Sequence, residues 1–449
     1  MKSLLEDAAR RSIDYLNGLS ARSVAPDPAA VAGLTKLAEP LPAGPTSPEE
    51  VLRLLDETCS AATLASAGPR FFGFVIGGSL PAALAANWLS AAWDQNAALY
   101  NATPASATLE QVALNWLVDL FGFPAGTGGA FVTGATMANF TALAAARHAV
   151  LARAGWNVEA DGLFGAPPIT VVVGEEVHTT MLKSLGLVGF GRSRLVRVPV
   201  DDQGRMRAEA FPALTGPAIV CLQAGNVNTG AFDPFVPLIE KAHAAGAWVH
   251  VDGAFGLWAL AAPQREYLAA GIRQADSWGT DAHKWLNVPY DSGLTFVREP
   301  AALAAAMAVT AEYLPTSSPN RNPSDYTPEL SRRGRGVEVW AALRSLGRQG
   351  VADLVEGCCR HATRFAEGLR AAGYEVLNNV TLNQVLVSFG DADKNRRVIE
   401  AIQKDGTCWA GGTVWQGRSA MRISVSSWAT TAEDVEISLE AILRAASSA

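Results

Sequence analysis

The segment Trp248-Val249-His250-Val251-Asp252-Gly253-Ala254 is a short, mostly apolar run that ends on a carboxylate and a glycine. A run of this length, closed by a turn residue, is typical of a strand that is covered on both faces of a sheet. A carboxylate at the end of such a strand becomes protonated unless a partner stabilises its charge. We therefore expect Asp252 to lie against a positively charged or hydrogen-bonding group.

Further apolar runs alternate with helical segments on both sides of this strand. The predicted strands are Gly129–Thr133, Ile169–Val173, Arg194–Val198, Ala218–Gln223, Trp248–Asp252, Ser277–Gly279 and Leu294–Val297. The predicted helices between them include Glu110–Phe121, Met137–Arg147 and His178–Leu187. This alternation predicts an α/β fold with a mostly parallel central sheet, followed by a smaller α+β C-terminal domain.

The pattern divides the chain into four expected parts. Residues 1–60, which are rich in proline, form an N-terminal arm that packs on a partner subunit, and residues 61–310 form the large α/β domain. Residues 311–335 are polar and broken by prolines, which suits a mobile active-site loop. Residues 336–449 form the small C-terminal α+β domain.

Composition excludes several classes of protein. The formal net charge of -7 argues against nucleic-acid binding, and the five cysteines lack the spacing of a metal site. Two long uncharged runs, Phe71–Trp93 and Leu120–Ala146, are interrupted by glycine and polar residues, so we assign them to soluble core and expect no membrane contact. No signal peptide is visible, and we expect a cytoplasmic protein whose low charged content (18%) reflects surface buried between subunits.

The predicted strand ends carry a recurring set of polar groups. Ligands of parallel sheets bind beyond the carboxyl ends of strands, so these residues are expected to meet. They are Ala135 and Thr136 at a helix N-terminus, His178, Asn226, Asp252 and Lys284. Each one has a structural alternative, such as helix capping for Thr136 and His178 or a simple turn for Asn226. Together they match a pyridoxal phosphate (PLP) site, which needs a lysine, a carboxylate, a phosphate cradle and a flat side chain.

Two motifs identify a family. The stretch Asp281-Ala282-His283-Lys284-Trp285-Leu286-Asn287-Val288-Pro289-Tyr290-Asp291 resembles the lysine signature of the group II PLP-dependent amino acid decarboxylases, and 250–254 resembles their aspartate motif. This family includes aromatic amino acid, histidine and glutamate decarboxylases. The resemblance implies the fold-type I, aminotransferase-like architecture, PLP as cofactor, and a homodimer with its active sites at the interface.

The resemblance also implies individual roles. Lys284 would carry the cofactor as a Schiff base, Asp252 would pair with the pyridine nitrogen, and His178 would stack on the ring. The full set of cofactor-binding residues would be Ala135, Thr136, His178, Asn226, Asp252, Ala254, His283 and Lys284. Asp281 falls where relatives often have asparagine, and a carboxylate there would repel the phosphate.

Three residues are candidates for the acid that protonates Cα after carbon dioxide leaves. Tyr326 is the first choice because relatives supply a tyrosine from a loop in this region, and Tyr313 and His178 follow. We expect decarboxylation of an L-amino acid to its amine, and oxidative deamination to an aldehyde is the alternative.

The side chains near the N-terminus favour an aromatic substrate. Phe72, Phe74 and Trp93 are expected to line the substrate pocket, although sealing a dimer interface explains them equally well. An acidic substrate would need an arginine clamp, for which Arg70 and Arg418 are available. An aminotransferase of the same fold would use Arg422 to bind a carboxylate.

Overall fold

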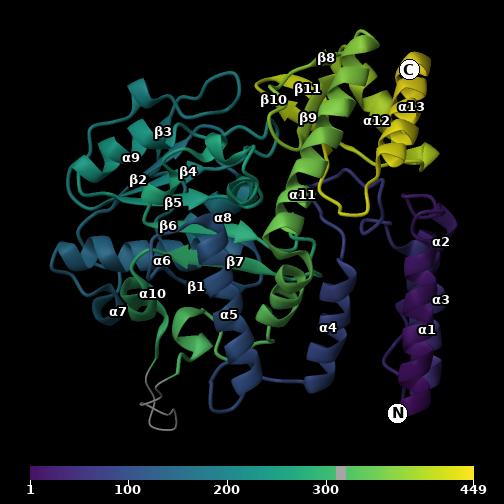
Figure 1. Cartoon of the computed structure of the whole chain (residues 1–449), viewed down its shortest axis with the longest axis horizontal. Coiled ribbons are helices and arrows are strands. Elements are labelled where there is room, and N and C mark those ends of the chain that lie inside the picture. Colours follow the sequence, from purple (N-terminus) through teal and green to yellow (C-terminus); the bar gives the residue numbers. More distant parts are fainter. Residues whose placement is uncertain (310–319) are drawn as a thin grey trace. The chain divides into compact units, whose positions relative to one another are not determined.

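The computed structural model of the chain describes residues 1–309 and 320–449, which form two compact units. The large unit comprises Ser79–Thr363 and Asn378–Gln384. The small unit comprises Met1–Gly78, Arg364–Leu377 and Val385–Ala449. Figure 1 shows both, coloured along the sequence.

A seven-stranded sheet forms the centre of the large unit. Its order is β1-β7-β6-β5-β4-β2-β3, and β7 runs antiparallel to both of its neighbours while the remaining pairs are parallel. The strands are β1 Gly128–Val132, β2 Thr170–Gly174, β3 Val196–Val198, β4 Ala218–Gln223, β5 Trp248–Asp252, β6 Ser277–Asp281 and β7 Gly293–Val297. The α/β class and the mostly parallel sheet are thereby confirmed.

Helices surround this sheet. They are α4 Pro81–Trp93, α5 Pro104–Phe121, α6 Ala135–Arg153, α7 Val158–Asp161, α8 Thr179–Leu187, α9 Phe235–Ala244 and α10 Pro300–Met307. Short 3₁₀ helices are η3 Ala208–Ala210, η4 Gly256–Ala261, η5 Glu266–Ala269, η6 Ile272–Gln274 and η7 Pro323–Tyr326. Across the described ranges, no helix has both the length and the apolar content that a membrane span requires.

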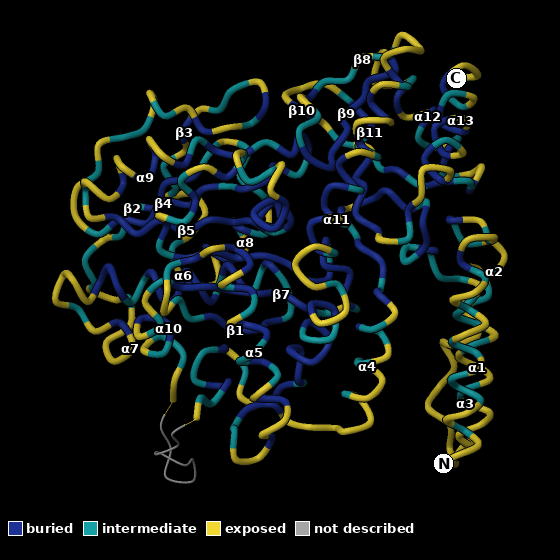
Figure 2. The backbone as a smooth tube through the Cα atoms, in the orientation of Figure 1, coloured by how far each residue is buried: buried dark blue, intermediate teal, exposed yellow. Residues whose placement is uncertain are grey.

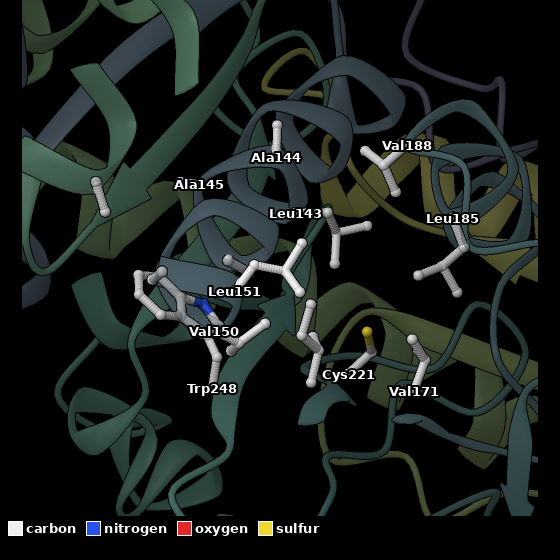
Figure 3. Packing of buried hydrophobic residues seen from close by; sticks show 14 of the residues in the cluster. Leu143, Ala144, Ala145, Val150, Leu151, Val171, Leu185, Val188, Cys221 and Trp248 are labelled. Carbon is white, nitrogen blue, oxygen red and sulfur yellow. The ribbon is translucent and has the colours of Figure 1, made fainter. Parts of the chain in front are cut away.

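Helix α6 packs along the sheet because small and aliphatic residues cover its buried face. Leu143, Val150 and Leu151 contact a cluster that includes Cys221 and Trp248 from the neighbouring strands β4 and β5 (Figure 3). The strands β4 and β5 are buried along nearly their whole length, as Figure 2 shows by the dark tube through them. The apolar core therefore fixes α6 against the strands whose ends carry the polar groups.

The small unit combines N-terminal helices with a second sheet. Its four-stranded sheet has the order β10-β11-β9-β8. Its strands are β8 Glu375–Val376, β9 Gln384–Ser388, β10 Gly411–Trp415 and β11 Arg418–Ser424. Its helices are α1 Lys2–Gly18, α2 Pro28–Gly33, η1 Leu34–Leu37, α3 Pro48–Cys59, η2 Ser60–Ala62, α12 Ala392–Asp405 and α13 Ala432–Ser448, and α11 Gly336–Ala371 continues into it from the large unit.

The expected boundaries at residues 60 and 336 differ from those of the compact units. Residues 1–78 belong to the same compact unit as the C-terminal segments: Phe72 N–H donates to the Trp409 carbonyl (2.8 Å), and Arg70 pairs with Asp434 (3.1 Å). Packing of residues 1–60 on a partner subunit stays a prediction. The boundary between the units falls within α11, between Thr363 and Arg364, and α11 itself is kinked at Gly347, where the backbone is not helical.

The segment that follows residue 319 is anchored by a buried ion-pair cluster. Glu110 of α5 accepts hydrogen bonds from Arg321 and Arg332, and the side chains of Glu110 and Arg332 are each 1% exposed. Arg332 also donates to the Phe131 carbonyl of β1 (2.8 Å). These contacts hold Arg321 and Arg332 to α5 and β1, while the mobility of residues 311–335 stays a prediction. Tyr313 lies outside the described residues.

We predict that Glu110→Gln lowers the free energy of unfolding by about 3 kcal/mol, because two buried guanidinium groups lose their counter-charge. The matched control is Asp119→Asn on the same helix, which breaks an exposed pair with Arg348 and should cost less than about 1 kcal/mol. Urea unfolding of the three proteins measures both values. Equal effects of the two substitutions would contradict a structural role for the buried cluster.

Candidate active site

The ends of β5 and β6 place the main polar residues at one edge of the large sheet. β5 ends at Asp252 and the adjacent parallel strand β6 ends at Asp281, three residues before Lys284. Helix α6 begins at Ala135 and α8 begins directly after His178. All of these residues belong to the large unit.

Asp252 is a buried carboxylate that positive groups surround. Only 6% of its surface is exposed. Burial raises its pKa, while the charges of His178 and Lys284, the N–H of Ala254 (3.2 Å) and the amide of Asn139 lower it. The geometry thus brings His178, Lys284 and Ala254 close to the one carboxylate that the sequence singled out.

His178 has a structural role and also faces the site. It is the N-cap of α8, where its Nδ1 accepts from the Thr180 N–H (3.3 Å) and lies 2.7 Å from the Thr180 hydroxyl. His178 therefore does cap α8, which is the structural alternative to a catalytic role that the sequence allowed. Capping uses Nδ1, so when the ring is neutral and Nδ1 accepts, the proton is carried by Nε2.

Asp281 connects the start of α6 with the lysine. Its Oδ1 accepts the Ala135 N–H (2.6 Å), and its Oδ2 lies 2.8 Å from Lys284 Nζ. His283 Nε2 lies 3.5 Å from the same carboxylate. An anion therefore sits at the helix N-terminus at which the sequence predicts phosphate binding, and that anion belongs to Asp281.

Two glycines permit the close backbone approach that forms this corner. A Cβ on Gly293 of β7 would fall on the backbone of Gly134, so β7 packs directly against the turn before α6. A Cβ on Gly134 would lie 3.2 Å from His283 Cε1 and 3.4 Å from Asp281 Oδ1. The close packing of β7 on this turn therefore requires glycine at position 293, while Gly134 leaves space beside His283 and Asp281.

The orientation of His283 is fixed from two sides. Its Nδ1 accepts the Ser292 N–H (3.1 Å), and its ring stacks on Tyr290 with centroids 4.2 Å apart. Burial lowers its pKa, which favours the neutral ring. Its Nε2 consequently points toward Asp281, next to the predicted phosphate site.

Asn226 shapes its own loop. Its Oδ1 accepts from the backbone N–H groups of Asn228 (2.8 Å) and Thr229 (3.2 Å), which is an Asx turn after β4. The turn alternative for this segment is thus realised, and a contact between Asn226 and the cofactor stays a prediction.

Thr136 is half-buried in the first turn of α6. The role of its hydroxyl as a phosphate ligand also stays a prediction.

Tyr326 has contacts that differ from those of the residues just described. It ends the short helix η7, packs against the hydrophobic cluster of α6 and α10, and has the Arg321 guanidinium 4.2 Å above its ring. None of these contacts brings it to Lys284 or Asp252. The sequence could not distinguish such a tyrosine from one that enters the site.

The predicted substrate residues have different environments. Phe72 has no exposed surface and packs edge-on against Phe365, which is the position of a core residue and does not support a substrate contact. Phe74 is 61% exposed beside Trp409 in the small unit. Trp93, at the end of α4 in the large unit, is 43% exposed.

Sequence reasoning missed three buried polar residues that adjoin Asp252. Asn139 of α6, His250 of β5 and Ser277 of β6 are hydrogen-bonded to one another and have no exposed surface. Of the three, only His250 could have been identified from the sequence. It stands two residues before Asp252, and alternation along a strand places both side chains on the same face of the sheet.

The described groups fit PLP. An amine, a buried carboxylate with positive neighbours and a helix N-terminus lie at one edge of the sheet, with an imidazole ring beside them. Among residues 1–309 and 320–449, no group of three His, Cys, Asp or Glu side chains is placed to hold a metal ion. The donor set thus favours the organic cofactor.

Comparison with known proteins agrees with this chemistry. The pyridoxal-dependent decarboxylase conserved domain matches residues 36–390. An aromatic-L-amino-acid decarboxylase of Bacillus atrophaeus is 26% identical over 98% of this chain and 94% of its own length. Tryptophan decarboxylase 1 of Oryza sativa subsp. japonica is 28% identical over 80% of this chain and 77% of its own length.

Solved structures share the fold. A crystal structure of Oryza sativa TDC with PLP and tryptamine has a TM-score of 0.91 at 24% identity and covers 100% of this chain and 97% of that chain. The crystal structure of Rhodiola rosea 4-hydroxyphenylacetaldehyde synthase has a TM-score of 0.85 at 22% identity, with 99% and 98% covered. Since the family match spans well over half of its residues, the chain belongs to the pyridoxal-dependent decarboxylase family and is a PLP-dependent amino acid decarboxylase, a carboxy-lyase.

Proposed function

We propose that this enzyme decarboxylates an aromatic L-amino acid to the amine and carbon dioxide, with the chemistry centred on Lys284 and Asp252. The observation that carries the assignment of the site is the buried Asp252 carboxylate, on which the charges of His178 and Lys284 both act. The proximity of these three groups is what a PLP site in this fold requires.

Lys284 and Asp252 have separate tasks in this proposal. PLP, when bound, supplies an electron sink for the pair of electrons left by the departing carboxylate. The Lys284 amine binds the cofactor covalently, and the Asp252 carboxylate holds a proton on the ring nitrogen because a nearby negative charge favours the charged form of a base. Burial of Asp252 strengthens that interaction, since few water molecules screen it.

The phosphate group is assigned to the start of α6. The N–H groups at that end of the helix, together with the Thr136 hydroxyl, are the donors. His283 adjoins this position through Asp281 (3.5 Å). Asp281 already accepts the Ala135 N–H. We therefore propose that Lys284 and the N-terminus of α6 stabilise two neighbouring anions, the Asp281 carboxylate and the cofactor phosphate.

His178 is the proposed acid that delivers a proton to Cα. The charge of His178 acts on Asp252, and the position of His178 at the N-cap of α8 is fixed by the hydrogen bond between Nδ1 and Thr180. The environment of Tyr326 in the cluster of α6 and α10 gives that tyrosine less support, although its role stays a prediction.

The available arginines support an aromatic rather than an acidic substrate. Arg70 donates to the Thr407 and Ser20 carbonyls (2.8 Å each) and pairs with Asp434. Arg418 pairs with Glu375 at the surface. Both guanidinium groups considered for an acidic clamp are therefore engaged within the small unit. Exposed Phe74 and Trp93 remain available as apolar contacts.

Two other reactions stay open. Phenylacetaldehyde synthase of Arabidopsis thaliana is 24% identical over 82% of this chain and 80% of its own length, and this similarity keeps aldehyde formation as the second candidate. An aminotransferase would use Arg422 of β11, whose pKa burial lowers to about 10. The curated relatives that we compared are named as decarboxylases or aldehyde synthases, which favours carboxylate loss over amino transfer.

We further propose that the enzyme is a homodimer with active sites at the subunit interface. Helices α1, α2 and α3 contain no buried residue, yet they carry apolar side chains that are 36–61% exposed. These side chains are Leu5, Ile13, Leu16, Val31, Val51, Leu54 and Leu55. A large exposed apolar surface of this kind is typical of a subunit contact.

A cytoplasmic location is the last part of the proposal. All five cysteines are unpaired, and four of them are buried. Free cysteines that form no disulfide are typical of proteins from a reducing compartment.

We predict that borohydride reduction of the purified holoenzyme attaches the cofactor to Lys284, and that peptide mapping finds the modification there. Lys284→Ala should abolish both attachment and turnover. Lys183→Ala, which removes an exposed lysine from α8, should leave both unchanged. Attachment to another lysine in the native enzyme would overturn the site assignment.

A panel of the twenty amino acids, scored for carbon dioxide, amine, aldehyde and keto acid, tests reaction and substrate together. The expected result is equal amounts of carbon dioxide and amine from an aromatic substrate, and no keto acid. Aldehyde with ammonia would replace the first candidate by the second. Turnover of glutamate above that of every aromatic amino acid would contradict the substrate class.

We predict that Leu54→Glu combined with Leu55→Glu shifts the protein toward monomer and lowers activity per chain, because charges enter an apolar contact. Sedimentation velocity over a range of concentrations measures the change. Phe164→Glu, at a side chain that is 98% exposed in the large unit, should not alter the assembly. A native protein that sediments as a monomer would refute the homodimer.

A further inference from the structure

A row of four buried polar side chains ends beside Asp252, and the proposed reaction uses none of them directly. We call this row the relay: Trp248, Ser277, His250 and Asn139. Each member is at most 1% exposed. Trp248, His250 and Asp252 alternate along β5, so they share one face of the sheet, and α6, which carries Asn139, packs against that strand.

Hydrogen bonds of ordinary length connect the relay. Trp248 Nε1 donates to Ser277 Oγ (2.9 Å), and the same oxygen lies 2.9 Å from His250 Nδ1. His250 Nε2 lies 3.0 Å from Asn139 Oδ1. The relay thus runs from the indole of β5 through β6 and β5 to α6.

The tautomer of His250 sets the direction of the relay. An indole nitrogen can only donate, so the Ser277 oxygen accepts from Trp248 and its own proton is available for His250. Burial lowers the pKa of His250 to about 3, so the ring is neutral and has one donor and one acceptor nitrogen. With Nδ1 accepting from Ser277, Nε2 carries the proton and donates to Asn139 Oδ1.

The opposite direction would leave like charges facing each other. If His250 Nδ1 donated to Ser277, then Nε2 would need the Asn139 amide as donor, and Asn139 Oδ1 would turn toward Asp252. A carbonyl oxygen against a buried carboxylate is unfavourable, because both atoms carry negative charge. The direction that begins at Trp248 avoids this contact.

The Asn139 amide therefore faces the carboxylate. Its Nδ2 is buried and has no hydrogen-bond partner of ordinary geometry in the described part of the chain, and the interaction of Asn139 with Asp252 lowers the pKa of that carboxyl group. Gly279 of β6 leaves room for this arrangement, since a Cβ there would lie 2.6 Å from Asn139 Oδ1.

We propose that Asn139 is a positioning residue that keeps Asp252 ionised and aimed, and that the relay through His250 fixes the orientation of its amide. This inference rests on the proposed role of Asp252 at the cofactor ring. The other titratable groups that act on Asp252 are His178 at the start of α8 and Lys284 after β6, and the Cys221 thiol of β4 is affected by it in turn.

The sign of the pH effect follows from burial. Burial raises the pKa of the Asp252 carboxyl group, and Asn139 is one of the groups that oppose this rise. Loss of the amide should raise that pKa further, so a larger fraction of Asp252 is protonated at a given pH. A protonated Asp252 no longer favours the proton on the ring nitrogen, so activity is lost from the acidic side first.

Asn139→Leu in the PLP-loaded enzyme tests this inference. The acid limb of the kcat profile should move up by about one to two pH units, as expected for loss of a hydrogen bond to a charged group. The pH at which the absorption spectrum of the bound cofactor changes should move in the same direction, while KM changes by less than about threefold. Thr141→Val, also buried on α6 and with an unpartnered hydroxyl, is the matched control and should shift neither profile.

Ser277→Ala is a second variant for the case in which Asn139→Leu does not fold. Ser277 is separated from Asp252 by two relay residues, His250 and Asn139, so the substitution should move both profiles in the same direction by a smaller amount. Native profiles in all folded relay variants, or equal shifts in Thr141→Val, would overturn the inference.

The variant Asp252→Ala separates the proposed role of Asp252 from the proposed role of the relay. If Asp252→Ala retains native kcat, the role of Asp252 fails. If Asp252→Ala is inactive while Asn139→Leu behaves like the native enzyme, only the role of the relay fails.

Discussion

The candidate site depends on the ionised state of one buried carboxylate. Asp252 ends a strand that is buried along its whole length, an environment that favours the neutral acid. Two cationic groups, a backbone N–H and a side-chain amide oppose that tendency, and they come from α8, the segment after β6, the turn after β5 and α6. Each of these elements is held by the apolar core, so the packing of the large unit determines the charge of the site.

The topology of the large sheet explains why these elements meet. Parallel pairing of β4, β5 and β6 sets their carboxyl ends at one edge, where polar loops can converge. Strand β7 pairs antiparallel with β6, and its first residue, Gly293, packs against the backbone of Gly134 in the turn before α6. The start of α6 therefore lies next to the segment that carries Lys284. A side chain at Gly293 would clash with the Gly134 backbone and push β7 away from the turn before α6.

The sequence predicted the parts of the site that local pattern encodes. The strand Trp248–Asp252 was predicted with its observed bounds, and the charge of Lys284 acts on the Asp252 carboxylate, while the shared role of the two residues stays a prediction. Asn139 could not be found in this way, because its partner His250 is 111 residues distant and its helix otherwise reads as apolar core. The packing of Tyr326 and the boundary inside α11 likewise depend on contacts between distant segments, which residue periodicity does not record.

The relay is difficult to explain as a device for stability. One to three turns further along α6, Leu143, Val150 and Leu151 fill the same helix-sheet interface with aliphatic side chains, at no cost in buried polar groups. Apolar replacement of buried polar groups is often neutral or stabilising, so four such groups in this core are not needed to hold it together. In the direction that keeps the Asn139 carbonyl away from Asp252, their hydrogen bonds satisfy one another and the Asn139 amide is the donor left over. The four relay residues therefore occupy positions that apolar side chains could fill, and their hydrogen bonds orient the Asn139 amide toward the Asp252 carboxylate.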